Sequence, residues 1–366
     1  MNPHSEGGHR FLVCRPPRPP VAWTPPEPTA ETGYDVRYMG RVLAAASRAL
    51  PATPPLTFIL TWDLDDLPET GRDVVAIVQG DEDARIPRWS DQVLVTFKCY
   101  GTLPPWMPLS TRPGMLEALE VAHFLRRVLL WTPGAARHIW NQARPGVRSA
   151  PIHAIPLGYY NQSDCGPIDF KHRRWTISFA GSGAEGPSTS GWRRALTPPK
   201  DRSRAQMRAA LEQLRAERPD EPILALYQRD FPALLPGQDT QARALTQSYS
   251  ELLAETRLCL VPRGNSPETF RFFEALRAGC IVVCESLPDH WFYRDAPVIR
   301  VRRWSELSSV IEPLLGDPPA MLELHQASLD WWTTRCSEAA VGQFVSLRIR
   351  AAMSGNGPNA LGTCAR

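Results

Sequence analysis

Short apolar segments alternate with helical segments from about residue 34 onward, and this alternation is the strongest constraint on the fold. The β-branched-rich segments 56–62, 73–79 and 93–100 predict buried parallel strands, and a helical pattern at 115–130 is expected to end at Pro133-Gly134. The same alternation returns later, with strands predicted at 174–182, 222–228, 258–262, 280–285 and 297–302 and helices at 203–217, 248–256 and 304–315. This pattern indicates βαβ crossovers and parallel sheets.

A gap between the two alternating runs, near residues 160–172, predicts an α/β chain with two Rossmann-like domains facing a central cleft. A chain of 366 residues is long enough for two such domains. We expect a Pro-rich disordered lead-in at 1–33, domains at 34–165 and 166–320, and C-terminal helices and a tail at 321–366 that cross back over the domains.

The composition is that of an ordinary globular protein, with 43% hydrophobic and 22% charged residues. A net charge of +3 without a basic run gives no support for nucleic-acid binding. No apolar segment reaches the roughly 18 residues of a membrane span, and no secretory leader is visible. The eight cysteines include no CxxC pair, which favours buried thiols in a reducing compartment. We therefore expect a cytoplasmic protein, and a peripheral membrane contact stays open.

One stretch, 257–285, combines a strand, a tight turn, a helix and a second strand. The turn Pro262-Arg263-Gly264-Asn265 lies at the carboxyl end of the predicted strand 258–262, where open α/β sheets bind ligands. Ser266 and Pro267 suit the N-cap and first position of the next helix, whose N–H groups would favour phosphate oxygens. Gly264 permits close approach of a ligand, and Arg263 supplies a forked cation. Glu268, expected in the first helical turn, would repel an anion.

Arg271 and Glu274 stand one turn apart on the predicted helix and share a face. A carboxylate accepts hydrogen bonds, which suits the two hydroxyl donors of a ribose. The alternative is a local salt bridge on a surface helix, and the two residues alone do not decide between these interpretations.

The segment "CLVPRG", a gap of five residues and "FRFFEALRAGCIVV" together resemble the signature of the exostosin family, glycosyltransferase family 47. A weaker likeness extends over the C-terminal half, and "IPLGY" at 155–159 is similar to a segment that precedes the second domain in related sequences. The resemblance implies a GT-B fold, with 34–165 as the acceptor domain and 166–320 as the nucleotide-sugar domain.

The resemblance also implies roles for individual residues. Arg263 would contact the donor diphosphate, Arg271 would assist it, and Glu274 would hold the ribose. Further donor contacts are expected from Gly264, Asn265, Ser266, Thr269, Gly181 and Ser182. The family's enzymes invert the anomeric centre and many use UDP-sugars, so a UDP-sugar is the expected donor and a glycan or lipid-linked molecule the expected acceptor, in polysaccharide or glycoconjugate assembly.

Two alternatives remain. One is an enzyme similar to family 10 fucosyltransferases that uses GDP-fucose, and the other is a non-catalytic glycan-binding protein that keeps the fold. Retaining GT-B enzymes often carry two glutamates separated by seven residues. Here Ser266 stands where the first would be, which favours inversion.

Inverting transfer needs a general base for the acceptor hydroxyl. Asp81 is the first candidate and Glu82 the second, because both follow the predicted strand 73–79 at its carboxyl end. Asp83 shares this turn, and solvated turn carboxylates are the alternative interpretation. His153 and His138 are weaker candidates.

Stabilisation of the leaving diphosphate is expected from Arg263, from local amides and from a basic loop. The basic residues of that loop are Arg193, Arg194, Lys200, Arg202 and Arg204. Asp63 and Asp65 form an Asp-x-Asp pair, but protein cations make a metal unnecessary, so we expect no metal and no cofactor. Trp106 and Trp291 are candidates for stacking on sugar rings, although packing is the commoner role of such residues.

Overall fold

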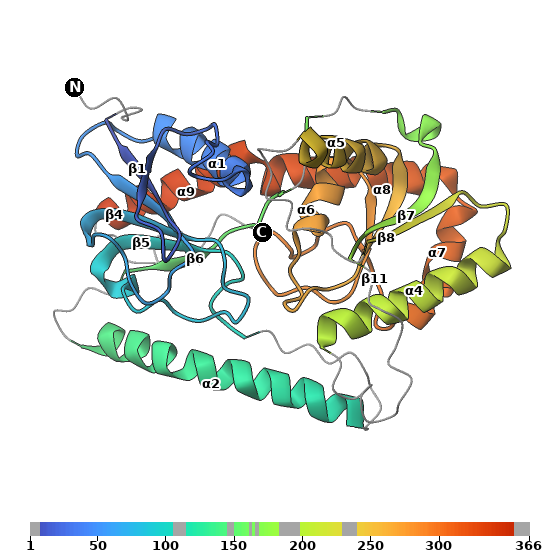
Figure 1. Cartoon of the computed structure of the whole chain (residues 1–366), viewed down its shortest axis with the longest axis horizontal. Helices are drawn as coiled ribbons and strands as arrows, with labels where there is room; N and C mark the ends of the chain where they lie inside the picture. Colours follow the sequence, from blue (N-terminus) through green and yellow to red (C-terminus); the bar gives the residue numbers. More distant parts are fainter. Residues whose placement is uncertain are drawn as a thin grey trace. The chain divides into compact units, whose positions relative to one another are not determined.

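The computed structural model describes residues 8–104, 115–144, 150–160, 163–164, 168–182, 198–228 and 240–354. The chain divides into two compact units. The N-terminal unit comprises Met1–Pro104, Arg126–Leu157 and Ser337–Arg366, and the C-terminal unit comprises Pro105–Leu125 and Gly158–Cys336. Figure 1 shows that each unit is built around its own sheet.

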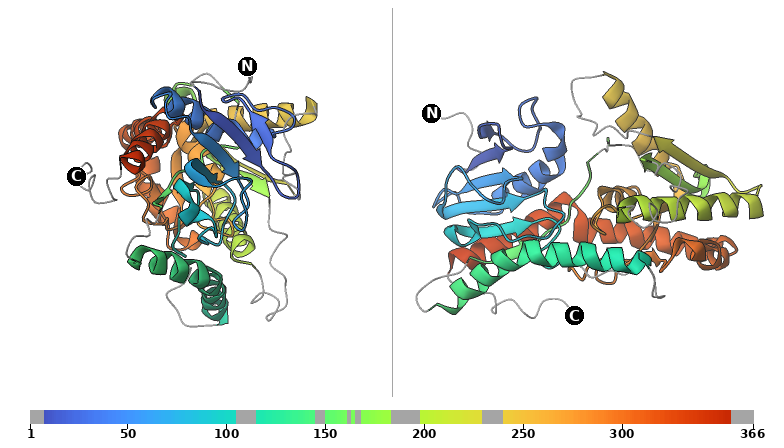
Figure 2. Two further views of the ribbon diagram at one scale, coloured as in Figure 1. Left: turned by 90° about the vertical axis from the view of Figure 1, so that its left-hand side faces the viewer. Right: turned by 60° about the horizontal axis from the view of Figure 1, so that its bottom comes forward.

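The N-terminal unit contains a six-stranded sheet with the order β2-β1-β3-β4-β5-β6. All neighbouring strands are parallel except the edge pair of β1 and β2. The strands are β1 Arg10–Cys14, β2 Val21–Trp23, β3 Thr57–Thr61, β4 Gly71–Val78, β5 Val93–Lys98 and β6 Ile152–Ala154. Helix α1 (Arg37–Arg48) packs against α9 (Glu338–Met353), and α9 also contacts β5 (Figure 2).

The predicted disordered lead-in at 1–33 is wrong for the residues that the structure describes. Strand β1 pairs in parallel with β3, and Phe11 stacks on Phe58 with ring centroids 5.0 Å apart. Trp23 is 1% exposed, and its Nε1 donates to Glu27 O at 2.8 Å. The prolines that suggested disorder follow β1 and β2 and do not interrupt them. Residues 1–7 lie outside the described part.

The C-terminal unit contains a five-stranded, wholly parallel sheet with the order β11-β10-β9-β7-β8. The strands are β7 Trp175–Ser182, β8 Ile223–Gln228, β9 Thr256–Val261, β10 Ile281–Cys284 and β11 Ile299–Arg300. The helices are α4 Pro199–Glu217, α5 Thr240–Ala254, α6 Phe270–Arg277, α7 Leu307–Leu315 and α8 Pro318–Trp331. Two parallel α/β sheets confirm the predicted fold class, with the strand crossovers of Rossmann-like units.

Three boundaries differ from the sequence prediction. Helix α2 (Met115–Ala143) continues through Pro133, because Gly134 lets the helix lie against Ile86: a Cβ at Gly134 would be 3.0 Å from Ile86 O. The predicted C-terminal segment 321–366 is not one structural group, since α8 belongs to the C-terminal unit and α9 to the N-terminal unit. The second unit also begins at Gly158 rather than near residue 166.

The cysteines of the described residues behave as small buried hydrophobes. Cys14, Cys99, Cys259, Cys280, Cys284 and Cys336 are all buried free thiols. Burial raises the pKa of Cys280 to about 11, so this thiol stays protonated and unreactive at neutral pH.

Close packing of α9 on α1 depends on Gly342. A Cβ at this position would lie 2.6 Å from Ala45 Cβ and 2.9 Å from Val42 O. Helix propensity alone would make Gly342→Ala stabilising by about 1 kcal/mol. We predict the opposite sign, a loss of about 1–3 kcal/mol from overpacking, measured by urea unfolding. Gly316→Ala is the control, since a Cβ there meets nothing closer than 3.7 Å. A stabilised Gly342→Ala variant would contradict this account.

Candidate functional site

The stretch 257–285 forms the carboxyl edge of the C-terminal sheet around β9 and β10. Helix α6 begins at Phe270, with an extended Thr269 as its N-cap, and not at the predicted Ser266-Pro267. Ser266 Oγ accepts from the amide of Glu268 at 3.5 Å, a local turn that competes with helix formation. Glu268 therefore precedes the helix and does not lie in its first turn.

Glu274 lies on α6 and is 3% exposed, so the alternative of a surface salt bridge does not describe it. Its Oε1 accepts from the amide of Tyr160 at 3.0 Å, and its Oε2 accepts from the hydroxyl of Tyr249 at 3.1 Å. Burial and the Glu274 charge raise the pKa of Tyr249, which keeps this hydroxyl a donor. A carboxylate has about four acceptor positions, and the two donors fix the orientation of this one.

Arg271 and Gly181 form one feature, although they come from α6 and β7. The Arg271 guanidinium lies 4.9 Å from the centroid of the Phe179 ring, and a Cβ at Gly181 would overlap with its Nη2. Glycine is therefore required at the end of β7 by the position of Arg271. The Nε of Arg271 is buried without a hydrogen-bond partner.

Arg204, on α4, lies near Arg271. Burial and repulsion from Arg271 lower the pKa of Arg204 to about 10, with partial compensation by Asp201. Lys200, Arg202 and Arg204 belong to α4 and not to a loop as predicted, because Pro199 starts that helix. Arg193 and Arg194 lie outside the described residues. Two guanidinium groups that repel each other and are partly desolvated suit an anion.

Glu285, which directly follows β10, holds the Arg263 turn in place. Its Oε2 accepts from the Arg263 amide at 2.9 Å and from Ser203 Oγ at 2.8 Å. Burial raises the pKa of Glu285, while these two donors oppose that effect. The amide of Arg263 is thus already engaged and is not a free donor for phosphate. Sequence reasoning missed Glu285, although a carboxylate directly after an apolar strand beside the motif was a visible signal.

The remaining residues of the turn occupy varied environments. Arg263 is 7% exposed, and its Nη2 donates to Asn265 O at 3.2 Å. A Cβ at Gly264 would lie 3.3 Å from Ser266 O, so protein packing explains only part of the need for glycine. Thr269 Oγ1 and Glu268 Oε2 are buried without hydrogen-bond partners.

Several predicted residues stay untested by the structure. Ser182 ends β7, and its side chain lies outside the described part, as does all of Trp106. Trp291 packs at its edge against Phe292 with centroids 5.4 Å apart.

A cavity of about 480 Å³ lies at the amino ends of β7 and β9, at the edge of the sheet opposite to the motif. The residues that line it include Phe170, Thr176, Arg257, Leu315 and Met321.

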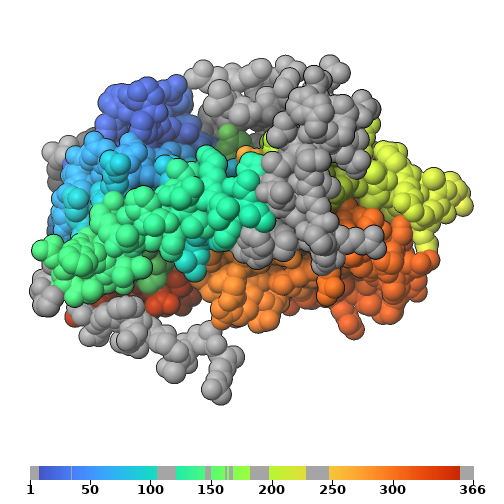
Figure 3. Space-filling view, turned by 90° about the horizontal axis from the view of Figure 1, so that it is seen from below, coloured from blue at the N-terminus to red at the C-terminus, as the bar shows by residue number. Residues whose placement is uncertain are grey.

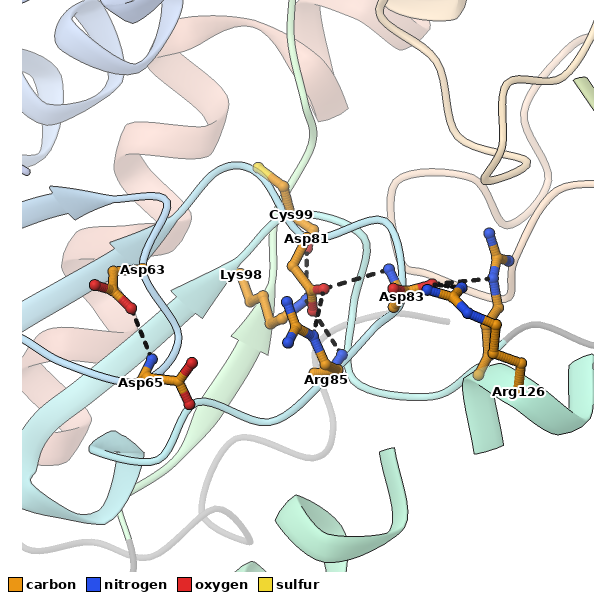
Figure 4. Close-up of polar contacts among 9 residues, drawn as sticks. Asp63, Asp65, Asp81, Asp83, Arg85, Lys98, Cys99 and Arg126 are labelled. Carbon is orange, nitrogen blue, oxygen red and sulfur yellow. Dashed lines mark hydrogen bonds and ion pairs between the residues drawn. The ribbon is translucent and has the colours of Figure 1, made fainter. Parts of the chain in front are cut away.

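Asp81, in the N-terminal unit, is the anchor of a buried ion pair (Figure 4). Its side chain is 2% exposed and lies 3.0 Å from Nζ of Lys98, which is fully buried at the end of β5. Arg85 donates to Asp81 from its amide at 2.6 Å and from Nε at 3.2 Å. This geometry favours a structural role for Asp81, as the counter-ion of Lys98, over that of a proton acceptor.

The other acidic and histidine candidates of this unit differ in exposure. Glu82 is exposed, whereas Asp83 pairs with Arg126 at 3.3 Å and Arg127 at 3.6 Å. His138 contacts Asp91 at 3.1 Å. Burial and Arg348 lower the pKa of His153 to about 4, which is consistent with a neutral core histidine.

Asp63 and Asp65 form a turn in which Asp63 Oδ1 accepts from the Asp65 amide at 2.8 Å (Figure 4). Such an Asx-turn is a local backbone feature. Within the described ranges, no group of three His, Cys, Asp or Glu residues is placed to hold a metal ion.

Comparison with known proteins supports the resemblance in the C-terminal half. Residues 141–313 match the model of the Exostosin GT47 domain. The chain is 41% identical over 63 residues to the exostosin-1 homolog of Caenorhabditis elegans, which covers 17% of this chain and 15% of that protein. It is 35% identical over 80 residues to exostosin-1 of Bos taurus, covering 21% and 10%. The predicted exostosin-like GT47 domain is thus confirmed, and the chain matches only a small part of the length of these relatives.

Among solved structures, the chain is similar to sucrose-phosphate synthase from Thermosynechococcus elongatus, with a TM-score of 0.41 and 10% identity. The similarity covers 87% of this chain and 93% of the other. The α/β fold itself rests on the two sheets described above.

The buried pair of Asp81 and Lys98 gives a prediction about stability. Lys98→Met leaves the Asp81 carboxylate buried beside a smaller set of donors, and we expect a loss of about 3–5 kcal/mol in urea unfolding. Asp65→Asn is the control, because Asp65 and its partner Arg88 have side chains that are 66% and 72% exposed, and such pairs contribute about 0–1 kcal/mol. Equal losses in the two variants would refute the structural role assigned to Asp81.

Proposed function

We propose that the chain is an inverting glycosyltransferase that moves a sugar from a nucleotide diphosphate, with UDP as the carrier, to a glycan or lipid-linked acceptor. The exostosin domain match over residues 141–313 supports this class of reaction. The observation that carries the donor assignment is the position of Arg271, over the Phe179 ring and against Gly181, with Arg204 as a second partly buried cation. Burial, and after it repulsion from Arg271, lowers the pKa of Arg204.

In this proposal the donor diphosphate lies between the Arg263 turn and the two guanidinium groups. An anion there would place a negative charge between the positive charges of Arg204 and Arg271. The buried Nε of Arg271 is available to donate a hydrogen bond to it. As the bond between the sugar and the diphosphate breaks, negative charge grows on the leaving oxygen. Preorganised cations stabilise that charge without any reorganisation.

The proposed position of the ribose is beside Glu274. The Tyr160 amide and the Tyr249 hydroxyl fix the orientation of the carboxylate. Both ribose hydroxyls can then donate to one carboxylate. Glu285 does not contact the donor in this proposal; it is a positioning residue that accepts a hydrogen bond from the amide of Arg263.

A general base must remove the proton from the acceptor hydroxyl. Of the two predicted carboxylates, Glu82 has the exposed side chain that proton exchange requires, whereas Asp81 neutralises Lys98. We therefore assign the base to Glu82. The donor is a substrate in this reaction, and the proposal invokes no cofactor.

Removal of one cation tests the donor site. We expect Arg271→Ala to weaken UDP binding about tenfold or more in calorimetry, because charge-assisted hydrogen bonds contribute about 1.5–3 kcal/mol. Arg294→Ala, at an exposed pair with Asp289, serves as the control and should bind like the wild type. Unchanged affinity in Arg271→Ala would remove the basis of the proposal, and binding of GDP alone would favour the fucosyltransferase-like alternative.

Removal of the base tests the chemistry separately. Glu82→Gln should slow sugar transfer by about 10²–10⁴-fold while UDP affinity stays the same. Asp83→Asn changes a neighbouring carboxylate of the same turn and should keep most of the rate. A full rate in Glu82→Gln, measured by nucleotide release with acceptor present, would exclude Glu82 as the base.

A further inference from the structure

Helix α2 (Met115–Ala143) exposes large apolar side chains to solvent. Leu125 is 52% exposed, Leu129 72%, Ile139 61% and Trp140 65%. Together with Ala122, Pro133, Ala136 and Ala143, which are also exposed, these residues recur every three or four positions. They therefore form one continuous stripe along the helix, here called the apolar stripe. Figure 3 shows α2 in green, running along the surface seen from below.

From Arg126 onward, where α2 belongs to the N-terminal unit, the opposite side of the helix packs on that unit. Trp131 Nε1 donates to Thr102 O at 2.6 Å, His138 lies 3.1 Å from Asp91, and Ala135 is 3% exposed. The packed side thus makes polar contacts, while large apolar side chains face outward. Contiguous exposed apolar surface of this kind marks an interaction site.

From residue 121 onward the charge along α2 has a single sign, whereas Glu117 and Glu120 lie in the first two turns of the helix. No Asp or Glu occurs from residue 121 to 163, whereas Arg126, Arg127, Arg137, Arg144 and Arg148 do. At 3.6 residues per turn, Arg126, Arg137 and Arg144 fall on one line that borders the apolar stripe.

Two acidic groups face α2 from elsewhere: Asp83 pairs with Arg126 and Arg127, and Asp91 contacts His138. Arg137 donates from Nη2 to Pro87 O at 2.9 Å. Among the described residues, Arg144 is thus the bordering arginine that no polar contact engages, and Arg126 is only partly neutralised, with a side chain that is 61% exposed.

We propose that α2 is an interfacial helix that docks the N-terminal unit onto an anionic lipid bilayer. The apolar stripe would lie in the boundary between headgroups and acyl chains, and the bordering arginines would contact lipid phosphates. A second copy of the chain is a poorer occupant, because it would bring two equally basic surfaces together. Within the described residues, no helix combines the length and apolar character needed to cross a bilayer, so a surface position is the fitting one.

This inference is independent of the proposed function, because it uses neither the donor site nor the base. Vesicle co-sedimentation of the full chain tests it, with vesicles of phosphatidylcholine alone and vesicles containing about three parts in ten of phosphatidylglycerol. We expect binding to the anionic vesicles that falls with added salt. The variant Leu129→Glu/Trp140→Glu should lower the partition coefficient about tenfold or more.

The control is Leu347→Glu on α9, a leucine that is 48% exposed and lies outside the apolar stripe. It should sediment like the wild type, and Arg126→Gln/Arg144→Gln should weaken binding to anionic vesicles and reduce its salt dependence. Circular dichroism confirms that each variant is folded. Absence of wild-type binding to anionic vesicles would overturn the proposal. So would a Leu129→Glu/Trp140→Glu variant that keeps vesicle binding but converts a dimer to a monomer in light scattering.

Discussion

The proposed donor site depends on the repulsion between two arginines in the C-terminal unit. Arg271 packs over Phe179 and occupies the space that a side chain at Gly181 would need, and Arg204 lies close to it. The lowered pKa of Arg204 corresponds to roughly 3 kcal/mol of unfavourable free energy in its charged form. Burial is the largest cause of this lowering and repulsion from Arg271 the second, and a bound anion would favour the charged form of both arginines.

Two buried carboxylates near this pair hold backbone amides in place. Glu285 accepts from the amide of Arg263, and Glu274 accepts from the amide of Tyr160. Both carboxylates are more than nine-tenths buried, so each is held by hydrogen bonds and not by solvent. In the N-terminal unit, the buried Asp81 carboxylate forms an ion pair with the side chain of Lys98. These buried carboxylates therefore hold neighbouring groups in position. Glu82 is exposed and Asp81 is buried, so Glu82 is the better candidate for the base.

The sequence predicted the strands well, because apolar β-branched runs that end in turn residues are local signals. It also placed Arg271 and Glu274 on one helix, since their spacing is local. The errors were of three physical kinds. Strand β1 was hidden by prolines on its flank, α6 began later because Ser266 forms its own turn, and α2 continued through Pro133 because Gly134 fits against Ile86. The partners of Asp81 and Glu285 come from neighbouring strands and helices, and no local pattern encodes them.

The most direct measurement of the central claim is calorimetric titration with inorganic pyrophosphate, which carries the diphosphate without sugar or base. The account predicts that pyrophosphate binds and competes with UDP. Its affinity should fall in the Arg204→Met variant, and it should also fall for the wild type when salt is added. Binding of UDP that pyrophosphate does not displace, or that Arg204→Met leaves unchanged, would contradict the claim that the two arginines hold the diphosphate.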